Sequence, residues 1–150
     1  MTGDRDREHL QHAIELAQRC PRSQTAFSVG TVIINGDGAV LATGYSRETD
    51  PHDHAEEAAL AKLTPDDSRL PAATLYSSLE PCSTRASRPR SCTELILATA
   101  IPRIVFAWRE PDLFVDCQGA ELLRAAGREV AEVSELAHLA RRTNQHLLEP

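Results

Sequence analysis

The sequence is poor in aromatic residues, in cysteines and in positive charge. Aromatic residues make up 4% of the chain and cysteines number four, while 16 basic residues against 22 acidic ones leave a formal net charge of -6. The acidic balance argues against general affinity for nucleic acid, because neutralising phosphates needs an excess of Lys and Arg. The shortage of stacking aromatics also disfavours an enzyme that edits nucleic acids. The composition does not exclude small-molecule substrates.

The chain also lacks internal repeats, low-complexity tracts and long apolar runs. Its longest apolar stretch, residues 95–101, is far too short to span a bilayer, and its first residues carry no apolar segment of a signal peptide. We therefore expect a cytoplasmic protein with reduced thiols, of which Cys20 and Cys117 have no partner pattern and are interpreted as structural. A length of 150 residues predicts a single domain over residues 1–150, and a content of 41% hydrophobic and 25% charged residues is ordinary for a globular protein.

The apolar patterns predict an α/β protein. An Asn-Gly-Asp-Gly turn at residues 35–38 joins two apolar runs and predicts a hairpin, and helices then alternate with strands. The expected strands span residues 29–34, 40–45, 74–78, 103–107 and 129–133. The expected helices span residues 5–19, 92–99, 117–126 and 136–147, with another that begins near Asp53. This order predicts a mixed five-stranded sheet, one hairpin followed by parallel additions, with helices on both faces.

The segment HAEEAAL places a glutamate where a helix should bury apolar residues. Ala59, Leu60 and Leu63 follow Glu56 at i+3, i+4 and i+7, so the carboxylate lies in the middle of the apolar stripe. One interpretation is a buried catalytic acid. The alternative is a capping box, with Asp53 as the N-cap and Glu56 folding back onto the helix end.

Two cysteines and a histidine occupy positions that suit a metal. Cys82 follows a predicted strand, whereas His54 and Cys92 each open a predicted helix, where thiolates are favoured. Zinc held by three protein ligands keeps its fourth position for water, whose pKa falls to roughly 7, so such a site indicates hydrolysis. Taken alone, the two cysteines would more often be buried core thiols than metal ligands.

These residues form a pattern known from zinc deaminases, which carry H-x-E followed by P-C and a second cysteine, the glutamate acting as general acid and base. The residues that carry the likeness are Val29-Gly30, His54-Ala55-Glu56, Thr74-Leu75-Tyr76, Leu79-Glu80-Pro81-Cys82, Cys92, Gly119, Leu122, Ala126-Gly127 and Asn144. Through them the chain resembles the cytidine and deoxycytidylate deaminase superfamily, and within it the pyrimidine deaminase domain of riboflavin biosynthesis.

The resemblance implies a three-layer α/β/α fold of the cytidine deaminase type and a homodimer or higher homo-oligomer. It also implies zinc held by His54, Cys82 and Cys92. Glu56 would be the catalytic residue, moving a proton from water to the leaving ammonia.

The sequence departs from the riboflavin deaminases at two places that bear on the substrate. Nine residues separate Cys82 from Cys92, where those enzymes usually have eight that are rich in His and Gly, and Ala26-Phe27-Ser28 stands where they tend to have Asn-Pro. The expected substrate is an aminopyrimidine, such as a ribosylaminopyrimidine phosphate of riboflavin synthesis. The alternatives are cytidine, deoxycytidylate or a related aminopyrimidine of specialised metabolism and, from another class, a non-catalytic zinc-binding module.

Three arginines between the two cysteines suggest recognition of a phosphate. Arg85, Arg88 and Arg90 stand out in an acidic protein, and the arginine fork suits phosphate oxygens. The alternative is a solvated loop whose arginines pair with surface acids or keep the thiolates ionised.

Other candidate contacts lie at strand ends. Phe27 is expected to pack against the base, and the backbone of residues 79–82, with the start of the next helix, to donate amide hydrogens to the tetrahedral intermediate. Arg47 and Glu48 follow a predicted strand, as does Trp108, which either lines the pocket or belongs to the core. The full set of expected substrate contacts is Phe27, Arg47, Glu48, Leu79, Glu80, Pro81, Arg85, Arg88 and Trp108.

Overall fold

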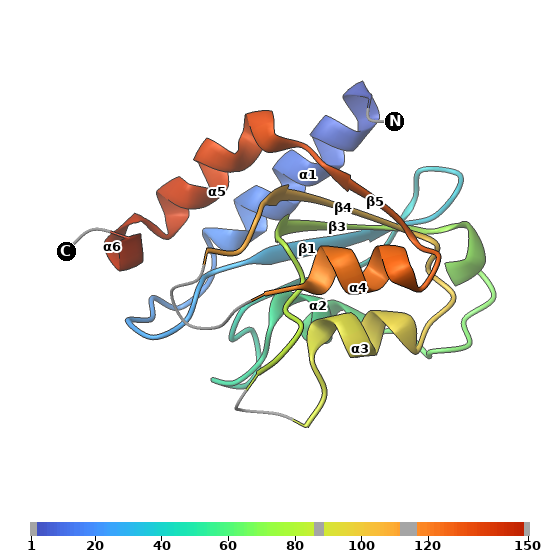
Figure 1. Cartoon of the computed structure of the whole chain (residues 1–150), viewed down its shortest axis with the longest axis horizontal. Coiled ribbons are helices and arrows are strands. Elements are labelled where there is room, and N and C mark those ends of the chain that lie inside the picture. Colours follow the sequence, from blue (N-terminus) through green and yellow to red (C-terminus); the bar gives the residue numbers. More distant parts are fainter. Residues whose placement is uncertain (1–2, 86–88, 112–116, 149–150) are drawn as a thin grey trace.

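A mixed five-stranded sheet forms the centre of the protein in the computed structural model, which describes residues 3–85, 89–111 and 117–148 (Figure 1). The strands are β1 (Gly30–Ile34), β2 (Val40–Tyr45), β3 (Thr74–Leu79), β4 (Arg103–Trp108) and β5 (Glu129–Glu132). Their order in the sheet is β2-β1-β3-β4-β5. β1 is antiparallel to both β2 and β3, while β3, β4 and β5 run parallel. The predicted hairpin with parallel additions is confirmed.

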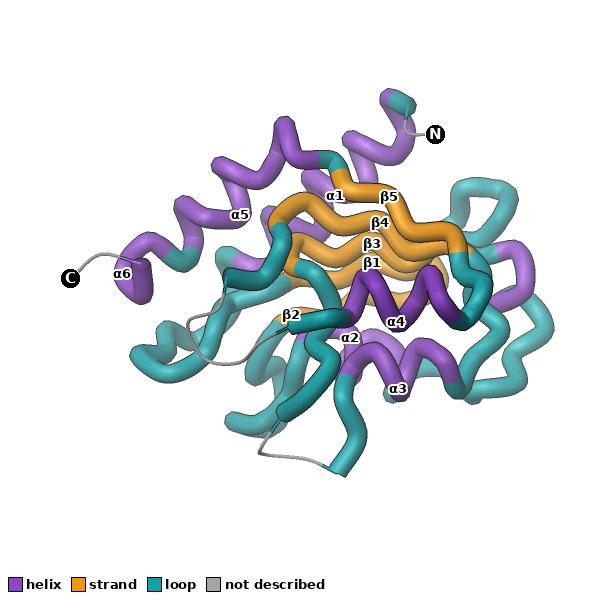
Figure 2. The backbone as a smooth tube through the Cα atoms, viewed as in Figure 1, coloured by secondary structure: helices purple, strands orange, loops and turns teal. Residues whose placement is uncertain are grey.

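Helices cover both faces of the sheet and make the expected three layers (Figure 2). The helices are α1 (Asp4–Ala17), α2 (Ala55–Leu60), α3 (Cys92–Leu97), α4 (Gly119–Ala125), α5 (Ala137–Thr143) and α6 (Gln145–Leu148), with short 3-10 turns at Leu70–Ala72 and Ser134–Leu136. α1 and α5 lie on one face, and α2, α3 and α4 lie on the other. Among the described residues, no helix combines the length and the apolar character needed to cross a bilayer.

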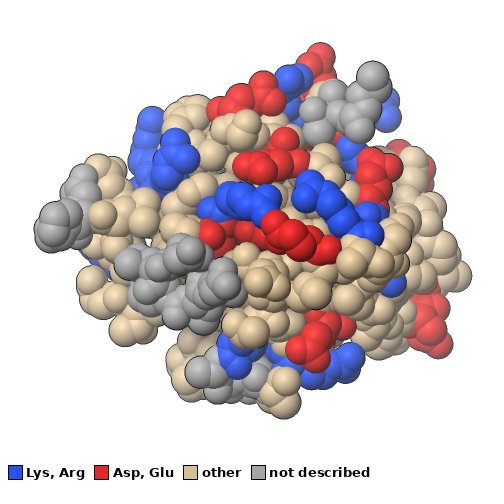
Figure 3. Space-filling model, viewed as in Figure 1, with Lys and Arg blue, Asp and Glu red and all other residues tan. Residues whose placement is uncertain are grey.

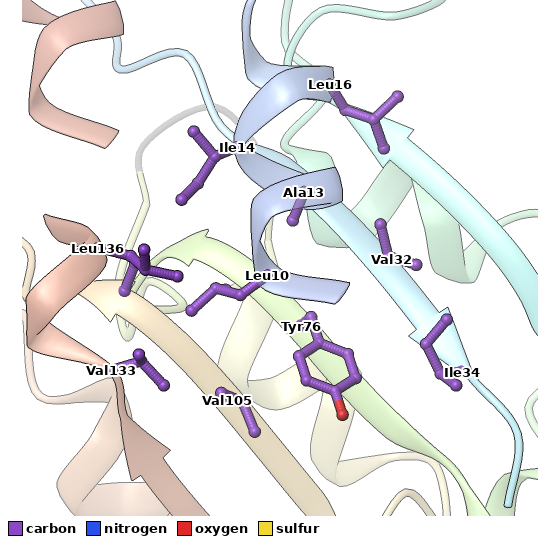
Figure 4. Close-up of a cluster of buried hydrophobic side chains, with 11 residues drawn as sticks. Leu10, Ala13, Ile14, Leu16, Val32, Ile34, Tyr76, Val105, Val133 and Leu136 are labelled. Carbon is purple, nitrogen blue, oxygen red and sulfur yellow. The ribbon is translucent and has the colours of Figure 1, made fainter. Parts of the chain in front are cut away.

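The central strands are apolar because both of their faces are covered. Every residue of β1 is buried, as are all but the first residues of β3 and β4, whereas the edge strands β2 and β5 are partly exposed. On the face under α1, Leu10 and Ile14 pack on Val32 and Val105, with the ring of Tyr76 beside them (Figure 4). The helical spacing of Leu10 and Ile14 explains why that side of α1 faces the sheet.

Two glycines allow helices to approach the site closely. A side chain at Gly44 in β2 would place its Cβ 2.4 Å from the carbonyl oxygen of Ala55, so the absence of a side chain lets α2 lie on the sheet. A Cβ at Gly119, the first residue of α4, would lie 1.9 Å from the carbonyl oxygen of Pro81. The first contact places the start of α2 against β2, and the second places the start of α4 against the loop after β3.

The last predicted helix differs from the observed structure. Residues 136–147 form α5 and α6 with a break at Asn144, whose side chain is buried with 1% exposed. Its Oδ1 accepts a hydrogen bond from the Ser28 amide at 2.6 Å, and its Nδ2 donates to the carbonyl oxygens of Ser28 and Ala140. These tertiary bonds hold Asn144 at the helix end, and no local pattern in the sequence indicates them.

Candidate active site

Three candidate metal ligands converge at the end of the sheet where the carboxyl ends of β3 and β4 lie. His54 precedes α2, Cys82 lies in the loop after β3, and Cys92 is the first residue of α3. Their ligand atoms all lie within 4.8 Å of one another. His54 Nδ1 is 3.5 Å from Cys82 Sγ and 3.3 Å from Cys92 Sγ. The structure thus brings the three predicted ligands together.

The chemistry of this cluster fits zinc. Hydrogen bonding from the Cys92 thiol, together with the nearby His54, lowers the pKa of Cys82 well below its usual range and favours the thiolate that a metal requires. One imidazole nitrogen and two sulfurs are ligands that zinc prefers. Over residues 3–85, 89–111 and 117–148, no further His, Cys, Asp or Glu joins the cluster, which is the pattern of an open zinc site.

The local structure of α2 rules out the capping-box interpretation of Glu56. The N-cap is His54 rather than Asp53, and it is Glu57 that folds back, its Oε1 accepting a hydrogen bond from the His54 amide at 3.3 Å. Asp53 Oδ2 instead accepts hydrogen bonds from Thr49 and from the Asp50 amide. The alternative interpretation of Asp53 and Glu56 as a capping box is therefore wrong.

Glu56 is buried beside the metal ligands. It is 4% exposed and lines the same cavity as His54 and Cys82. Burial, with a further contribution from the negative charge of Cys82, raises the pKa of Glu56 to about 7. A carboxyl group whose pKa lies near neutrality can both accept and donate a proton.

A cavity of about 630 Å³ opens in front of these residues. Its walls come from residues 22–29, from the loop after β2, from the start of α2 and from the loop after β3. This volume lies within the usual range for small-molecule sites.

Five of the predicted substrate contacts line the cavity: Phe27, Arg47, Leu79, Glu80 and Arg85. The guanidinium of Arg47 donates hydrogen bonds to the carbonyl oxygens of Pro21 and Phe27 and to Ser28 Oγ, so it supports the wall that carries Phe27. Trp108 is 7% exposed and is not among the residues that line the cavity; its ring packs edge-on behind Phe27, with ring centroids 5.4 Å apart. Of its two interpretations, the structure favours the core.

The loop after β3 contributes differently from what the sequence suggested. Leu79 and Glu80 line the cavity and Pro81 does not. The amide of Glu80 donates to the carbonyl oxygen of Trp108 and the amide of Cys92 donates to Cys82 Sγ, so these two expected donors are already engaged. Glu48 also lies outside the cavity lining and forms an ion pair with a lysine, Lys62 Nζ to Glu48 Oε2 at 2.7 Å.

The inter-cysteine arginines do not behave alike. The side chain of Arg85 is 3% exposed and forms an ion pair with Glu57, whereas Arg90 is exposed. Arg88 lies outside the described residues. On the face seen in Figure 3, basic and acidic side chains are interspersed.

Glu110 is a functional candidate that the sequence reasoning missed. It lines the cavity, its amide donates to Glu80 Oε1, and its buried Oε2 has no hydrogen-bond partner among the residues that the structure describes. Burial raises the pKa of Glu110 to about 7. Glu110 lies two residues after the end of β4, and β4 runs parallel to β3, the strand that leads to Cys82. This position next to the end of a neighbouring parallel strand is the signal that could have identified it.

Glu80 and the cysteines outside the cluster have structural partners. Glu80 is 2% exposed, and its two carboxylate oxygens accept the amides of Glu110 and Ala120, which ties the start of α4 to the loops after β3 and β4. Cys20 Sγ donates to the carbonyl oxygen of Val29, and Cys117 Sγ to that of Pro81.

Comparison with known proteins gives a consistent set of relatives. Residues 4–108 match the family described as the cytidine and deoxycytidylate deaminase zinc-binding region. The diaminohydroxyphosphoribosylamino-pyrimidine deaminase of Schizosaccharomyces pombe is 43% identical over 128 residues, which cover 83% of this chain and 31% of that protein. The riboflavin biosynthesis protein RibD of Aquifex aeolicus is 33% identical over 141 residues, which cover 93% of this chain and 38% of that protein.

Solved structures agree with the fold. The crystal structure of a diaminohydroxyphosphoribosylaminopyrimidine deaminase/5-amino-6-(5-phosphoribosylamino)uracil reductase from Thermotoga maritima superposes with a TM-score of 0.81 at 30% identity, over 96% of this chain and 40% of that one. The present chain therefore spans roughly a third of the length of the curated relatives that it matches.

Proposed function

The chain belongs to the cytidine and deoxycytidylate deaminase family, and from that premise we propose that it is a zinc-dependent hydrolase that removes an exocyclic amine from an aminopyrimidine and releases ammonia. The observation that carries this proposal is Glu56, a buried carboxyl group on the wall of a small-molecule cavity beside three metal ligands. A purely structural metal site has no need of such an acid. We also propose that residues 1–150 form one domain of this kind.

His54, Cys82 and Cys92 would hold the zinc through Nδ1 and the two Sγ atoms. Zinc bound by three protein ligands supplies a water molecule whose pKa is lowered to roughly 7, which makes it a nucleophile at neutral pH. The surrounding protein orients these ligands, since the cap of α2 fixes His54 and the Ser91–Glu94 capping box fixes the helix start that carries Cys92.

Glu56 carries the proton transfers. Its carboxylate accepts a proton as water attacks the ring carbon that bears the amine, and its carboxyl group then donates a proton to the nitrogen that leaves as ammonia. The raised pKa of about 7 suits both steps, and general acid–base catalysis of this kind contributes about 10² to 10⁴ in rate.

The substrate that we propose is a ribosylaminopyrimidine phosphate of riboflavin synthesis, as the names of the relatives suggest. Phe27 would lie against the ring. The free Oε2 of Glu110 would accept an N–H of the ring or of its amino substituents, because a buried carboxylate oxygen without a partner favours a ligand that donates to it. The family likeness also supports a homo-oligomer, which sedimentation velocity would detect.

An ammonia-release assay on zinc-loaded protein tests the proposal. We expect rapid ammonia release from diaminohydroxyphosphoribosylaminopyrimidine and none above background from cytidine or deoxycytidylate. Turnover of cytidine or deoxycytidylate alone would contradict the proposed substrate but keep the deaminase assignment. No release from any of the three would contradict the deaminase assignment and favour a zinc-binding module without catalytic activity.

A further inference from the structure

We propose that Arg85 and Glu57 are positioning residues: their ion pair fastens the inter-cysteine loop to the first turn of α2 and so holds His54 and Cys82 at the spacing that the metal needs. We call this contact, with its link to the His54 amide, the Arg85–Glu57 bridge. The inference rests on the zinc site proposed above, and it assigns to Arg85 a role different from binding a substrate phosphate.

The bridge joins two separate metal-ligand segments. Arg85 follows Cys82 by three residues, and Glu57 follows His54 by three residues. Arg85 Nη1 lies 3.2 Å from Glu57 Oε1, and the same Oε1 accepts the hydrogen bond from the His54 amide at 3.3 Å. A single carboxylate oxygen therefore connects the loop after Cys82 to the backbone of His54.

A second contact fixes the other end of the guanidinium. Arg85 Nη2 donates to the carbonyl oxygen of His52 at 2.7 Å, so both terminal nitrogens are directed at the chain segment around His54. The planar fork of arginine can make these two contacts at once, whereas the single ammonium of lysine cannot reproduce the geometry.

Burial makes the bridge a strong constraint. The Arg85 side chain is 3% exposed and the Glu57 side chain 24% exposed, so the pair is shielded from solvent far more than a surface ion pair. An arginine that binds a substrate phosphate needs its terminal nitrogens to be available to the ligand. Arg85 lines the cavity, but its terminal nitrogens contact Glu57 and the carbonyl oxygen of His52, and removal of Glu57 would leave the buried guanidinium without its charged partner.

Metal retention measures the bridge directly, without substrate. Groups that orient metal ligands typically contribute 10- to 100-fold to metal affinity. We expect Arg85→Met and Glu57→Gln each to speed zinc transfer to a chromogenic chelator by about tenfold relative to the unsubstituted protein. Glu57→Gln keeps an oxygen that can accept the His54 amide, so it isolates the loss of the ion pair.

Three further variants make the test specific. Arg90→Met removes an exposed arginine from the same loop and should leave zinc release unchanged. The double variant Arg85→Met/Glu57→Gln should lose zinc no faster than the faster single variant, because both changes remove one contact. Arg85→Lys keeps a positive charge beside Glu57 and so disturbs folding less than Arg85→Met. It should still release zinc faster than the unsubstituted protein.

The outcomes separate this proposal from the others. Unchanged zinc release in Arg85→Met and Arg85→Lys, with a raised KM for the phosphorylated substrate but not for its dephosphorylated form, would overturn the bridge and make Arg85 a phosphate contact. Additive effects in the double variant would also overturn it. Failure of the unsubstituted protein to bind zinc would overturn the metal site itself, whereas failure to release ammonia would leave the zinc measurement intact.

Discussion

The pKa values of buried carboxyl groups are shifted in opposite directions at the two ends of the parallel strands β3 and β4. At the start of β4, Asp6 accepts hydrogen bonds from both terminal nitrogens of Arg103 at 2.8 Å and from the hydroxyl of Tyr76 at 2.6 Å. Arg103 contributes most to lowering the pKa of Asp6 to about 2. At the other end, burial raises the pKa values of Glu56 and Glu110 to about 7.

This contrast separates the carboxyl groups that stabilise the fold from those that are available for chemistry. A carboxylate that is fully paired is ionised at every ordinary pH and contributes to folding. A carboxyl group that is buried in a cavity without a cationic partner makes folding less favourable but can exchange protons with a ligand. Asp6 is of the first kind. It accepts a hydrogen bond from the hydroxyl of Tyr76, whose ring packs in the apolar cluster beneath α1 (Figure 4).

The largest expected effect comes from Glu56→Gln. Glutamine keeps the size of glutamate but cannot take the proton, so the rate of ammonia release should fall by about 10² to 10⁴. Zinc content, measured by atomic absorption, should stay unchanged, and the thermal unfolding midpoint should not fall, because the substitution removes a buried group whose ionisation opposes folding. A variant that still turned over at the normal rate would show that another group moves the proton, and the contrast between the two strand ends would fail.

Asp6→Asn should give the opposite result. Asparagine cannot neutralise Arg103, so the free energy of unfolding in urea should fall by about 2 kcal/mol, as expected for hydrogen bonds to charged groups. The kcat of ammonia release should stay within twofold, because Asp6 lies away from the cavity-lining residues. If Asp6→Asn lost activity without losing stability, Asp6 would act on the site rather than on the fold.

The pH dependence of stability sharpens this prediction. Because the folded pKa of Asp6 is about 2 and its ordinary value is 3.8, its stabilising contribution is fully present above about pH 4 and is lost as the pH falls toward 2. Asp6→Asn should therefore have a flatter stability profile than the unsubstituted protein between pH 4 and 2. Equal slopes in that window would contradict the assignment of the lowered pKa to Asp6.

The sequence predicts the parts of the molecule that depend on local pattern. The Asn35–Gly38 turn specified the hairpin, and the positions of Cys82 after a strand and Cys92 at a helix start brought the two sulfurs together. Long-range contacts decided the rest. The break at Asn144 depends on Ser28, which is 116 residues away in the sequence, and no periodicity can indicate such a bond.

The same distinction explains the differences within the site. Asp53 is a favourable N-cap residue by local preference, yet its carboxylate is engaged by Thr49 and the Asp50 amide in the preceding turn, and the helix begins one residue later with His54 as the N-cap. Arg85 and Arg90 look alike in the sequence, yet one is buried against Glu57 and the other is exposed. Glu110 lies just beyond β4, and it becomes recognisable only when β3 and β4 are known to pair in parallel.

The smallest effect that we predict is for Glu110→Gln, and it tests whether the unpaired Oε2 of this carboxylate contacts the substrate. Loss of one charged hydrogen bond to a ring N–H should lower kcat/KM by about tenfold, with the zinc content unchanged. Since the pKa of Glu110 is raised from 4.5 to about 7, its contribution makes folding less favourable as the pH rises from 4.5 to about 7 and this cost is fully present at pH 8, where the variant should be at least as stable as the unsubstituted protein. Glu121→Gln, which removes an exposed partner of Arg109, is the matched control and should leave kcat/KM unchanged. Normal kcat/KM in Glu110→Gln would mean that its Oε2 does not face the ring, and of these two cavity-lining carboxyl groups with a raised pKa, Glu56 alone would then have a role in the reaction.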